Sequence, residues 1–539
     1  MKLTRLSLFA ACLVVCASPL PAQDSGAPPD PAPLPPGGQP PAPAPGVPPG
    51  GAPTNGTPAA APTGAAPIAI KTAEDQLAVV RVNVTNQPWD LIRPWGKRAP
   101  SSRRAIGAVL AGQRVLVTAE LVANANYVEL ETAEGGEKTA ATVETVDYEA
   151  NLAILKPDDA SFLKDFGTLE LTEARVGDQL MIWQLENTGT LLGTSALVTT
   201  AEVSAYPIDN SPLLVYRATA SLQFRDSSFT LPVVKDGKLV GMIMRYDNNT
   251  KNLELVPAPV IQHFLKDAAK PPYEGFPRVG MMFSNTRDPQ LRRFIGLAGQ
   301  ATGGVYITDV IKDGPAERAG IQKGDVLLAV DGKAVDQDGN YNEPAYGKLS
   351  LIHLLSTGHF DGDKVKFSLF REGAKKEVEV QIANRKPQDY VVEPYVIDRA
   401  PHYYVLGGLV LQELSRQYLK EWGPDWMKKG PEELIYLDRQ QNELFRDGPK
   451  KLVFLTSVLP SPTSIGYEDL HHLIVTKIND QPLDSLADVP VALTKATNGL
   501  HKIEFDREPL AIYLDDAAIK AGDEDLMKNY RLPGLKRLE

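Results

Sequence analysis

Residues 68–270 consist of short runs in which β-branched and apolar residues alternate with polar ones, separated by turn residues such as the Asp-Gly of 236–237. Alternation with a period of two is typical of strands that bury one face, and many such strands at close spacing favour an all-β barrel or sandwich. A helical pattern occurs only at 258–269, with the sequence APVIQHFLKDAA. This region is therefore predicted to be a β domain that ends in one helix.

A different unit occurs twice in the C-terminal half. Residues 303–335, GGVYITDVIKDGPAERAGIQKGDVLLAVDGKAV, combine a strand, a turn, a short helix, a second strand and a hairpin turn. A weaker copy lies at 451–483, where Ile465-Gly466-Tyr467 takes the place of Gly320-Ile321-Gln322. An internal repeat of one supersecondary unit predicts two related α+β modules after the β domain.

The first residues have the layout of a signal peptide. Lys2 and Arg5 precede an apolar run from Leu6 to Ala17, which is too short for a permanent membrane span, and small residues and prolines follow up to Ala22. The mature protein is therefore expected to be exported, to a periplasm or to the exterior. Both cysteines lie in this segment and fit a lipoprotein signal poorly. A cysteine-free mature chain excludes disulfides and cysteine metal ligands.

Residues 23–66 are almost wholly Pro, Ala and Gly. Such a stretch has too little apolar bulk to offset its ordering entropy, so it is predicted to be a disordered, extended linker. A plain spacer is favoured over a ligand for a proline-binding domain.

Several classes of function are disfavoured by composition. A net charge of −11 opposes general binding to nucleic-acid phosphates, and no later apolar run is long enough to span a membrane. No glycine-rich phosphate loop occurs between a strand and a helix. His471 and His472 are adjacent, and neighbouring side chains of a strand point to opposite faces, so they are not expected to share a metal ion. We expect no metal and no cofactor.

The first repeat resembles a PDZ domain. The residues that carry this resemblance are Gly314-Pro315-Ala316, Ala319-Gly320-Ile321, Gly324-Asp325-Val326-Leu327 and Asp331-Gly332. The resemblance implies a groove between a strand and a helix, entered through a loop whose N–H groups face the terminal carboxylate of a peptide. By position, this peptide-binding loop is Arg278, Val279, Gly280, Met281 and Met282. The alternative is that these residues form an ordinary core strand.

The whole arrangement resembles the HtrA/Deg family of serine endoproteases, and most closely its plant-type members. The residues that carry this likeness include VLVTAELV (115–122), DYEANLAILK (147–156) and PAPVIQHFLKD (257–267), together with the order of the modules. It implies a trypsin-like double β-barrel followed by two PDZ domains, the second of them degenerate because it lacks the Gly-Asp pair. The implied domains are 1–22 signal peptide, 23–66 linker, 67–270 protease-like domain, 271–392 first PDZ domain, 400–515 second PDZ-like domain and 516–539 C-terminal tail.

The catalytic positions of that family do not hold a Ser-His-Asp triad here. The resemblance places Glu120 at the histidine, Asn151 at the aspartate and Ser228 at the nucleophile, with Ser227 as the shifted alternative. A carboxylate of ordinary pKa is a poor base for a serine hydroxyl, and an amide cannot offset an imidazolium charge. Histidine is also absent from the β domain before its final helix, where His263 is expected to be a packing residue.

We therefore expect an exported pseudoprotease that binds C-terminal or extended peptides of unfolded or partner proteins, as a chaperone, adaptor or regulator. The resemblance also implies a trimer-based homo-oligomer, and the aromatic segment 87–95 falls where family trimers make contacts; barrel packing is the alternative. The rival hypothesis is an active endopeptidase in which Ser228 uses an unorthodox base, for example Lys235 or Lys238.

Overall fold

The computed structural model describes residues 68–69, 77–222, 230–297, 299 and 302–539. Contacts divide the chain into residues 1–62 and 63–539, and every element below belongs to the second unit. The predicted signal peptide and linker, residues 1–66, lie outside the described residues. No described helix is long and apolar enough to cross a membrane.

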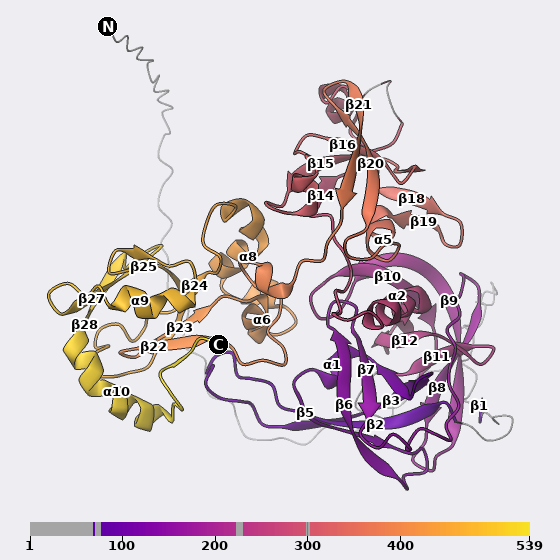
Figure 1. The fold of residues 1–539 in the computed structure, drawn as a ribbon, viewed down its shortest axis with the longest axis horizontal. Helices are drawn as coiled ribbons and strands as arrows, with labels where there is room; N and C mark the ends of the chain where they lie inside the picture. Colours follow the sequence, from indigo (N-terminus) through magenta and orange to yellow (C-terminus); the bar gives the residue numbers. More distant parts are fainter. Residues whose placement is uncertain (1–67, 70–76, 223–229, 298, 300–301) are drawn as a thin grey trace, which may run out of the picture. The chain divides into compact units, whose positions relative to one another are not determined.

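The first part of the β region is a closed barrel (Figure 1). Its strands are ordered β2-β3-β4-β7-β6-β5, and β5 pairs back to β2. Inward residues two apart, such as Val82 and Val84, pack with Leu130 in its core, as the period of two predicts. The strands are β2 (Val79–Asn86), β3 (Ser101–Leu110), β4 (Arg114–Val117), β5 (Ala125–Glu131), β6 (Lys138–Asp147) and β7 (Leu152–Pro157).

A second barrel follows it. Strands β9, β10, β13, β12, β11 and β8 pair in that order, β8 pairs back to β9, and β1 (Ile68–Ala69) adds to β9. Helix α2 (Ala258–Ala268) buries Ile261 and Phe264 after the last strand, so the predicted helix is confirmed. The double β-barrel is confirmed with it. The strands are β8 (Gln179–Leu185), β9 (Leu191–Ala205), β10 (Pro212–Thr219), β11 (Pro232–Lys235), β12 (Lys238–Asp247) and β13 (Asn252–Pro257).

The first repeat forms a module around the sheet β14-β15-β16-β20-β21. Within it, β15, α4 and β16 reproduce the strand, short helix and strand of the predicted unit, and the Asp331-Gly332 turn leads into β17 (Lys333–Ala334). Strand β14 forms one edge of this sheet. The other elements are β14 (Met281–Ser284), α3 (Pro289–Phe294), β15 (Val305–Val310), α4 (Pro315–Arg318), β16 (Val326–Val330), β18 (Asn340–Glu343), β19 (Gly347–Ser350), α5 (Leu351–Ser356), β20 (Lys364–Arg371) and β21 (Ala374–Gln381).

The second repeat forms the sheet β28-β27-β25-β24-β23-β22-β29, with β26 paired to β25. Its elements are β22 (Tyr403–Leu406), β23 (Leu409–Glu413), α6 (Arg416–Leu419), α7 (Trp426–Lys429), α8 (Glu432–Leu444), β24 (Val453–Val458), β25 (Leu473–Ile478), β26 (Gln481–Pro482), α9 (Val489–Leu493), β27 (Leu500–Phe505), β28 (Ala511–Asp515), α10 (Asp516–Tyr530) and β29 (Lys536–Arg537).

Residues 516–539, which we expected to be a tail, are part of this second module. They form α10 and β29, and β29 pairs with β22. Ile519 and Leu526 are buried from one face of α10. Only two apolar residues of this mostly polar helix are buried, so its pattern gave a weak amphipathic signal.

The aromatic segment 87–95 packs against the second module of the same chain. Leu91 is buried in a cluster with Leu414 and Tyr418, and Trp95 packs edge-on against Tyr403 at 6.1 Å between ring centroids. The amide of Gln412 donates to the Leu91 carbonyl at 3.0 Å. Packing within the chain thus covers Leu91 and part of Trp95, and the expected subunit contact at this segment stays a prediction.

Candidate functional site

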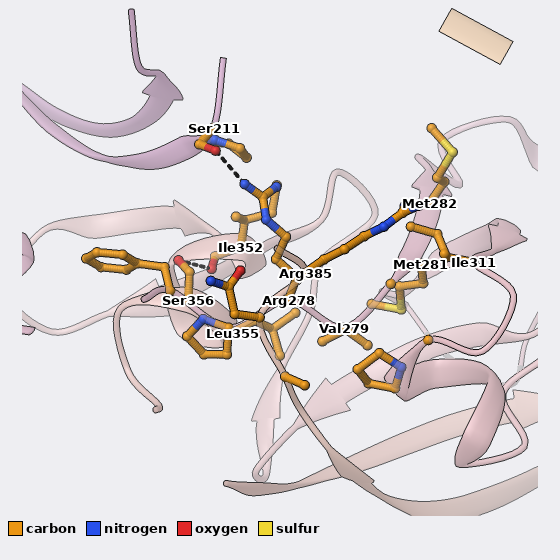
Figure 2. A pocket seen from close by; sticks show the side chains of 18 of the residues that line it. Ser211, Arg278, Val279, Met281, Met282, Ile311, Ile352, Leu355, Ser356 and Arg385 are labelled. Carbon is orange, nitrogen blue, oxygen red and sulfur yellow. Dashed lines mark hydrogen bonds between the residues drawn. The ribbon is translucent and has the colours of Figure 1, made fainter. Parts of the chain in front are cut away.

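A cavity of about 650 Å³ runs along the first module between β14 and α5, and residues of the neighbouring domains, including Ser211 and Asn442, also line it. Leu351, Ile352 and Leu355 of α5 line it. Ile311 also lines it and lies near Met281 (Figure 2). Arg278, Val279, Gly280, Met281 and Met282 all line the same cavity. The structure thus brings the five residues of the predicted peptide-binding loop together on one side of a groove.

The backbone of this loop leaves donors available. The Val279 carbonyl accepts the Ala316 N–H and the Gly280 carbonyl accepts the Ile311 N–H, both at 2.8 Å. Within the described chain, the N–H groups of Val279 and Gly280 donate to no backbone carbonyl. Gly280 has a φ of +74°, which a side chain would strain. Successive free N–H groups in such a turn form a concave site for a carboxylate.

Strand β14 offers a second kind of contact. It pairs with β15 on one side only, so its other edge faces the groove beside α5. An extended peptide can add to such an edge through main-chain hydrogen bonds. Met281 and Leu355 present apolar surface there, and Met282 is half-exposed. The groove is therefore suited to a peptide that ends in an apolar residue.

Arg278 is not free to bind a ligand carboxylate on its own. Its guanidinium donates to Glu149 at 2.7 Å and to Ser211, and it lies 3.8 Å from Asp209. Figure 2 shows the bond to Ser211, which comes from the second barrel. Burial raises the pKa of Glu149 to about 7, although the nearby Arg278 opposes that shift. Sequence reasoning missed these partners because Glu149 and Ser211 are far from Arg278 along the chain.

The corresponding edge of the second module is occupied. There, the tight Gly407-Gly408 turn joins β22 to β23, and β22 pairs along the edge of β23 that matches the free edge of β14. The Gly407 carbonyl accepts hydroxyl protons from Ser461 and Thr463. A Cβ atom at Gly407 would lie 2.9 Å from Ile519 of α10. The chain itself covers the place where a peptide would enter this module.

The catalytic positions lie beside the first barrel. Glu120 is in the short helix α1 (Ala119–Val122), and its backbone N–H donates to Asn151 Oδ1 at 3.0 Å. Asn151 is fully buried, and its Nδ2 has no partner within the described residues. Burial raises the pKa of Glu120, against the opposing effect of Arg103 and Arg245.

The nucleophile position cannot be placed. Ser228 and its alternative Ser227 lie outside the described residues. Thr230, two residues beyond Ser228, lies with its Oγ1 2.5 Å from that of Thr118, just before Glu120.

The other candidate bases have structural partners. Lys235 forms an ion pair with Asp178 at 2.7 Å, and Lys238 forms one with Glu170 at 2.8 Å. His263 stacks between Phe276 and Phe360, with ring centroids 4.2 and 4.3 Å away. Its Nε2 lies 2.8 Å from the carbonyl of His359. These contacts favour packing and surface pairing for all three side chains.

Comparison with known proteins gives two matches to models of the PDZ domain, at residues 277–382 and 392–535. The chain is 25% identical over 464 residues to the Arabidopsis thaliana protein "Protease Do-like 2, chloroplastic", which covers 85% of this chain and 74% of that protein. "Protease Do-like 4, mitochondrial", from the same plant, is 22% identical over 460 residues, with 85% and 84% covered.

Solved structures that resemble the chain include the HtrA-type protease AlgW with a tripeptide. The identity is 19% and the TM-score 0.45, with 58% of this chain and 95% of that chain covered. A serine endoprotease from Yersinia pestis is 18% identical, with a TM-score of 0.38, and covers 59% of this chain and 100% of that chain.

Proposed function

The chain carries two PDZ domains and has Deg/HtrA proteases as its homologues, and from this premise we propose that it is a peptide-binding pseudoprotease of that kind. The observation that carries the proposal is the groove between β14 and α5. It combines unpaired loop N–H groups at Val279 and Gly280, an open strand edge and apolar walls. Its ligands are the C-terminal or extended segments of unfolded or partner proteins.

Loss of proteolysis is the second part of the proposal. A neutral amide at Asn151 cannot balance an imidazolium, and the sequence has no histidine between residues 68 and 257 to take a serine proton. The backbone N–H of Glu120 donates to Asn151 Oδ1, which supports a structural role for these two residues at the positions that the family resemblance assigns to the base and its carboxylate. The β domain then serves as a scaffold for the PDZ modules.

The cellular part of the proposal rests on the sequence and on family resemblance. The signal-peptide layout supports export of the mature protein, to a periplasm or to the exterior. There it acts as a trimer-based homo-oligomer in the quality control of envelope proteins, as a chaperone or as an adaptor that regulates an active relative.

An active serine endopeptidase is the alternative, because the homologues are named proteases. One local observation favours it: burial raises the pKa of Glu120, and a carboxyl with a raised pKa is a better proton acceptor than an ordinary one. In this alternative, Ser228 is the nucleophile.

Incubation of the purified mature protein with unfolded casein, alongside a fluorophosphonate probe for reactive serines, separates the two functions. The pseudoprotease proposal predicts no cleavage, no labelling and no difference between the wild type and Ser228→Ala. Cleavage that disappears in Ser228→Ala would establish the endopeptidase, and Glu120→Gln would then test the base.

A further inference from the structure

Three arginines, Arg278, Arg318 and Arg385, line the groove of the first module, and they differ in how their charge is balanced. Arg278 has the carboxylates of Glu149 and Asp209 beside it. Arg385, just beyond the last strand of the module, lines the same cavity, and no described carboxylate forms an ion pair with it (Figure 2). Among the described residues, Arg278 is therefore neutralised by carboxylates, whereas Arg385 and the more exposed Arg318 form no ion pair.

Arg385 is held in position by uncharged groups. Its guanidinium lies 3.8 Å from the centre of the Tyr390 ring, a cation–π contact. It also donates to Asn442 Oδ1 at 3.3 Å and to the Asp389 carbonyl at 3.1 Å. The Asp389 carboxylate instead accepts the Lys386 N–H at 3.1 Å. A guanidinium has five N–H donors, so these contacts orient it and leave further donors for a ligand.

The surroundings of Arg385 favour an incoming anion. Its side chain is half-buried, and burial lowers its pKa; the nearby Tyr390 and Asp389 oppose this shift, and Arg278 adds to it. A partly desolvated cation next to another cation gains more from an added carboxylate than a solvated surface charge does. Arg318 also lines the groove, but it is exposed to solvent; it donates to the Asp313 carbonyl, and no described carboxylate forms an ion pair with it.

We propose that Arg385 makes the first PDZ groove selective for peptides that carry an Asp or Glu side chain close to their C-terminal residue. The loop N–H groups of Val279 and Gly280 take the terminal carboxylate, and Arg385 pairs with the second, side-chain carboxylate. This inference rests on the proposed peptide binding and adds the chemistry of the ligand. Bidentate pairing of a planar, pre-oriented guanidinium with a carboxylate makes the interaction both strong and directional.

The test uses the full-length mature protein and fluorescent peptides with one constant apolar C-terminal residue. Glu and Gln are compared in turn at each of the preceding positions. At one position, the wild type is expected to bind the Glu peptide about tenfold more tightly than the Gln peptide, the gain of one charged hydrogen-bonded pair. Arg385→Gln is expected to abolish this preference while the affinity for the Gln peptide stays within about twofold.

Two further variants sharpen the result. Arg385→Glu, with Lys in the peptide at the same position, is expected to invert the preference. Arg318→Gln removes one positive charge from the same groove and serves as the matched control, with the preference retained.

Four outcomes would overturn the inference. One is equal affinity of the wild type for the Glu and Gln peptides at every position, and another is a preference that survives in Arg385→Gln or disappears in Arg318→Gln. An equal loss for Glu and Gln peptides in Arg385→Gln would mean that Arg385 binds the terminal carboxylate instead. Failure of the wild type to bind any peptide would overturn the proposed function as well, which distinguishes that failure from the other three.

Discussion

The two PDZ modules are built from the same repeated unit, yet they treat the edge strand of the sheet in opposite ways. In the first, β14 pairs with β15 alone and faces a cavity. In the second, β22 covers the matching edge of β23, and β29 covers β22 in turn. Exposed edges invite pairing with another chain, so a protein either uses an edge or covers it. A single added hairpin strand can therefore turn a binding module into a structural one.

The loops before these edge strands also differ, because the first is open and the second is covered. Gly280 leaves adjacent N–H groups open, whereas Gly407 and Gly408 form a hairpin turn whose carbonyls accept bonds from the segment 459–463. The second module also packs against the segment 87–95 of the first barrel. We therefore assign peptide binding to the first module and internal packing to the second.

The largest effect is expected from Gly280→Trp. A bulky side chain at a φ of +74° would displace the loop N–H groups and fill the groove, so peptide binding should fall about a hundredfold or more. Fluorescence anisotropy of a labelled C-terminal peptide measures this. Val491→Trp, at an exposed position on α9 of the second module, is the control and should bind as the wild type does. Unchanged affinity in Gly280→Trp would show that the loop has been misplaced.

The next largest effect concerns the helix that covers the second module. Ile519→Ala removes a buried side chain that packs at Gly407, and it should lower the free energy of unfolding by about 2–4 kcal/mol. Urea denaturation measures the loss. Peptide stoichiometry should not change, because β22 still covers the edge of β23. The appearance of a second peptide site in this variant would mean that α10, not β22, closes the module.

A smaller effect is expected from the Gly-Asp pair that the first module keeps and the second lacks. Asp325 is buried and forms a two-pronged ion pair with Arg371, with one N–O distance of 2.7 Å. Asp325→Ala should lower the unfolding free energy by about 2 kcal/mol. His472 directly precedes β25, as Asp325 directly precedes β16. His472→Ala should lower the unfolding free energy by less than half as much. Equal losses would remove this distinction between the modules.

A final effect is a pH dependence at the base of the first groove. Burial raises the pKa of Glu149 from 4.5 to about 7, beside Arg278, Asp147 and Asp209. The folded state then binds more protons than the unfolded state between these values, so this contribution is complete below about pH 4.5 and is lost as the pH rises through about 7. Stability should therefore fall as the pH rises across this window.

Urea denaturation at a series of pH values measures that slope. Glu149→Gln should flatten it, and Glu144→Gln, at a less buried carboxylate paired with Arg114, should not. A wild-type stability that rises across the same window would contradict the assigned shift.

Much of the fold could be predicted from local patterns. Alternating residues identified the strands of both barrels, and the GPA and GD motifs located α4 and β16, because these signals lie within a few neighbouring residues. The role of residues 516–539 could not be predicted in the same way. Strand β29 pairs with β22 more than a hundred residues away, and such a pairing depends on tertiary contacts.

The candidate site shows the same division. The five groove residues follow from the motif, because a glycine before a strand marks a loop that can approach a ligand. The partners of Arg278 and the uncharged setting of Arg385 come from segments that only folding brings together, including Ser211 and Asn442. Sequence reasoning therefore located the groove but could not predict which of its arginines are neutralised by carboxylates.

The most direct test of the central claim is isothermal titration of the full-length mature protein with a peptide that ends in a free carboxylate and with its C-terminally amidated form. We predict one binding site per chain, at least about tenfold weaker binding of the amidated peptide, and loss of that site in Gly280→Trp. Two sites per chain, or equal affinity for the two peptides, would contradict the assignment of carboxylate-directed peptide binding to the first PDZ module alone.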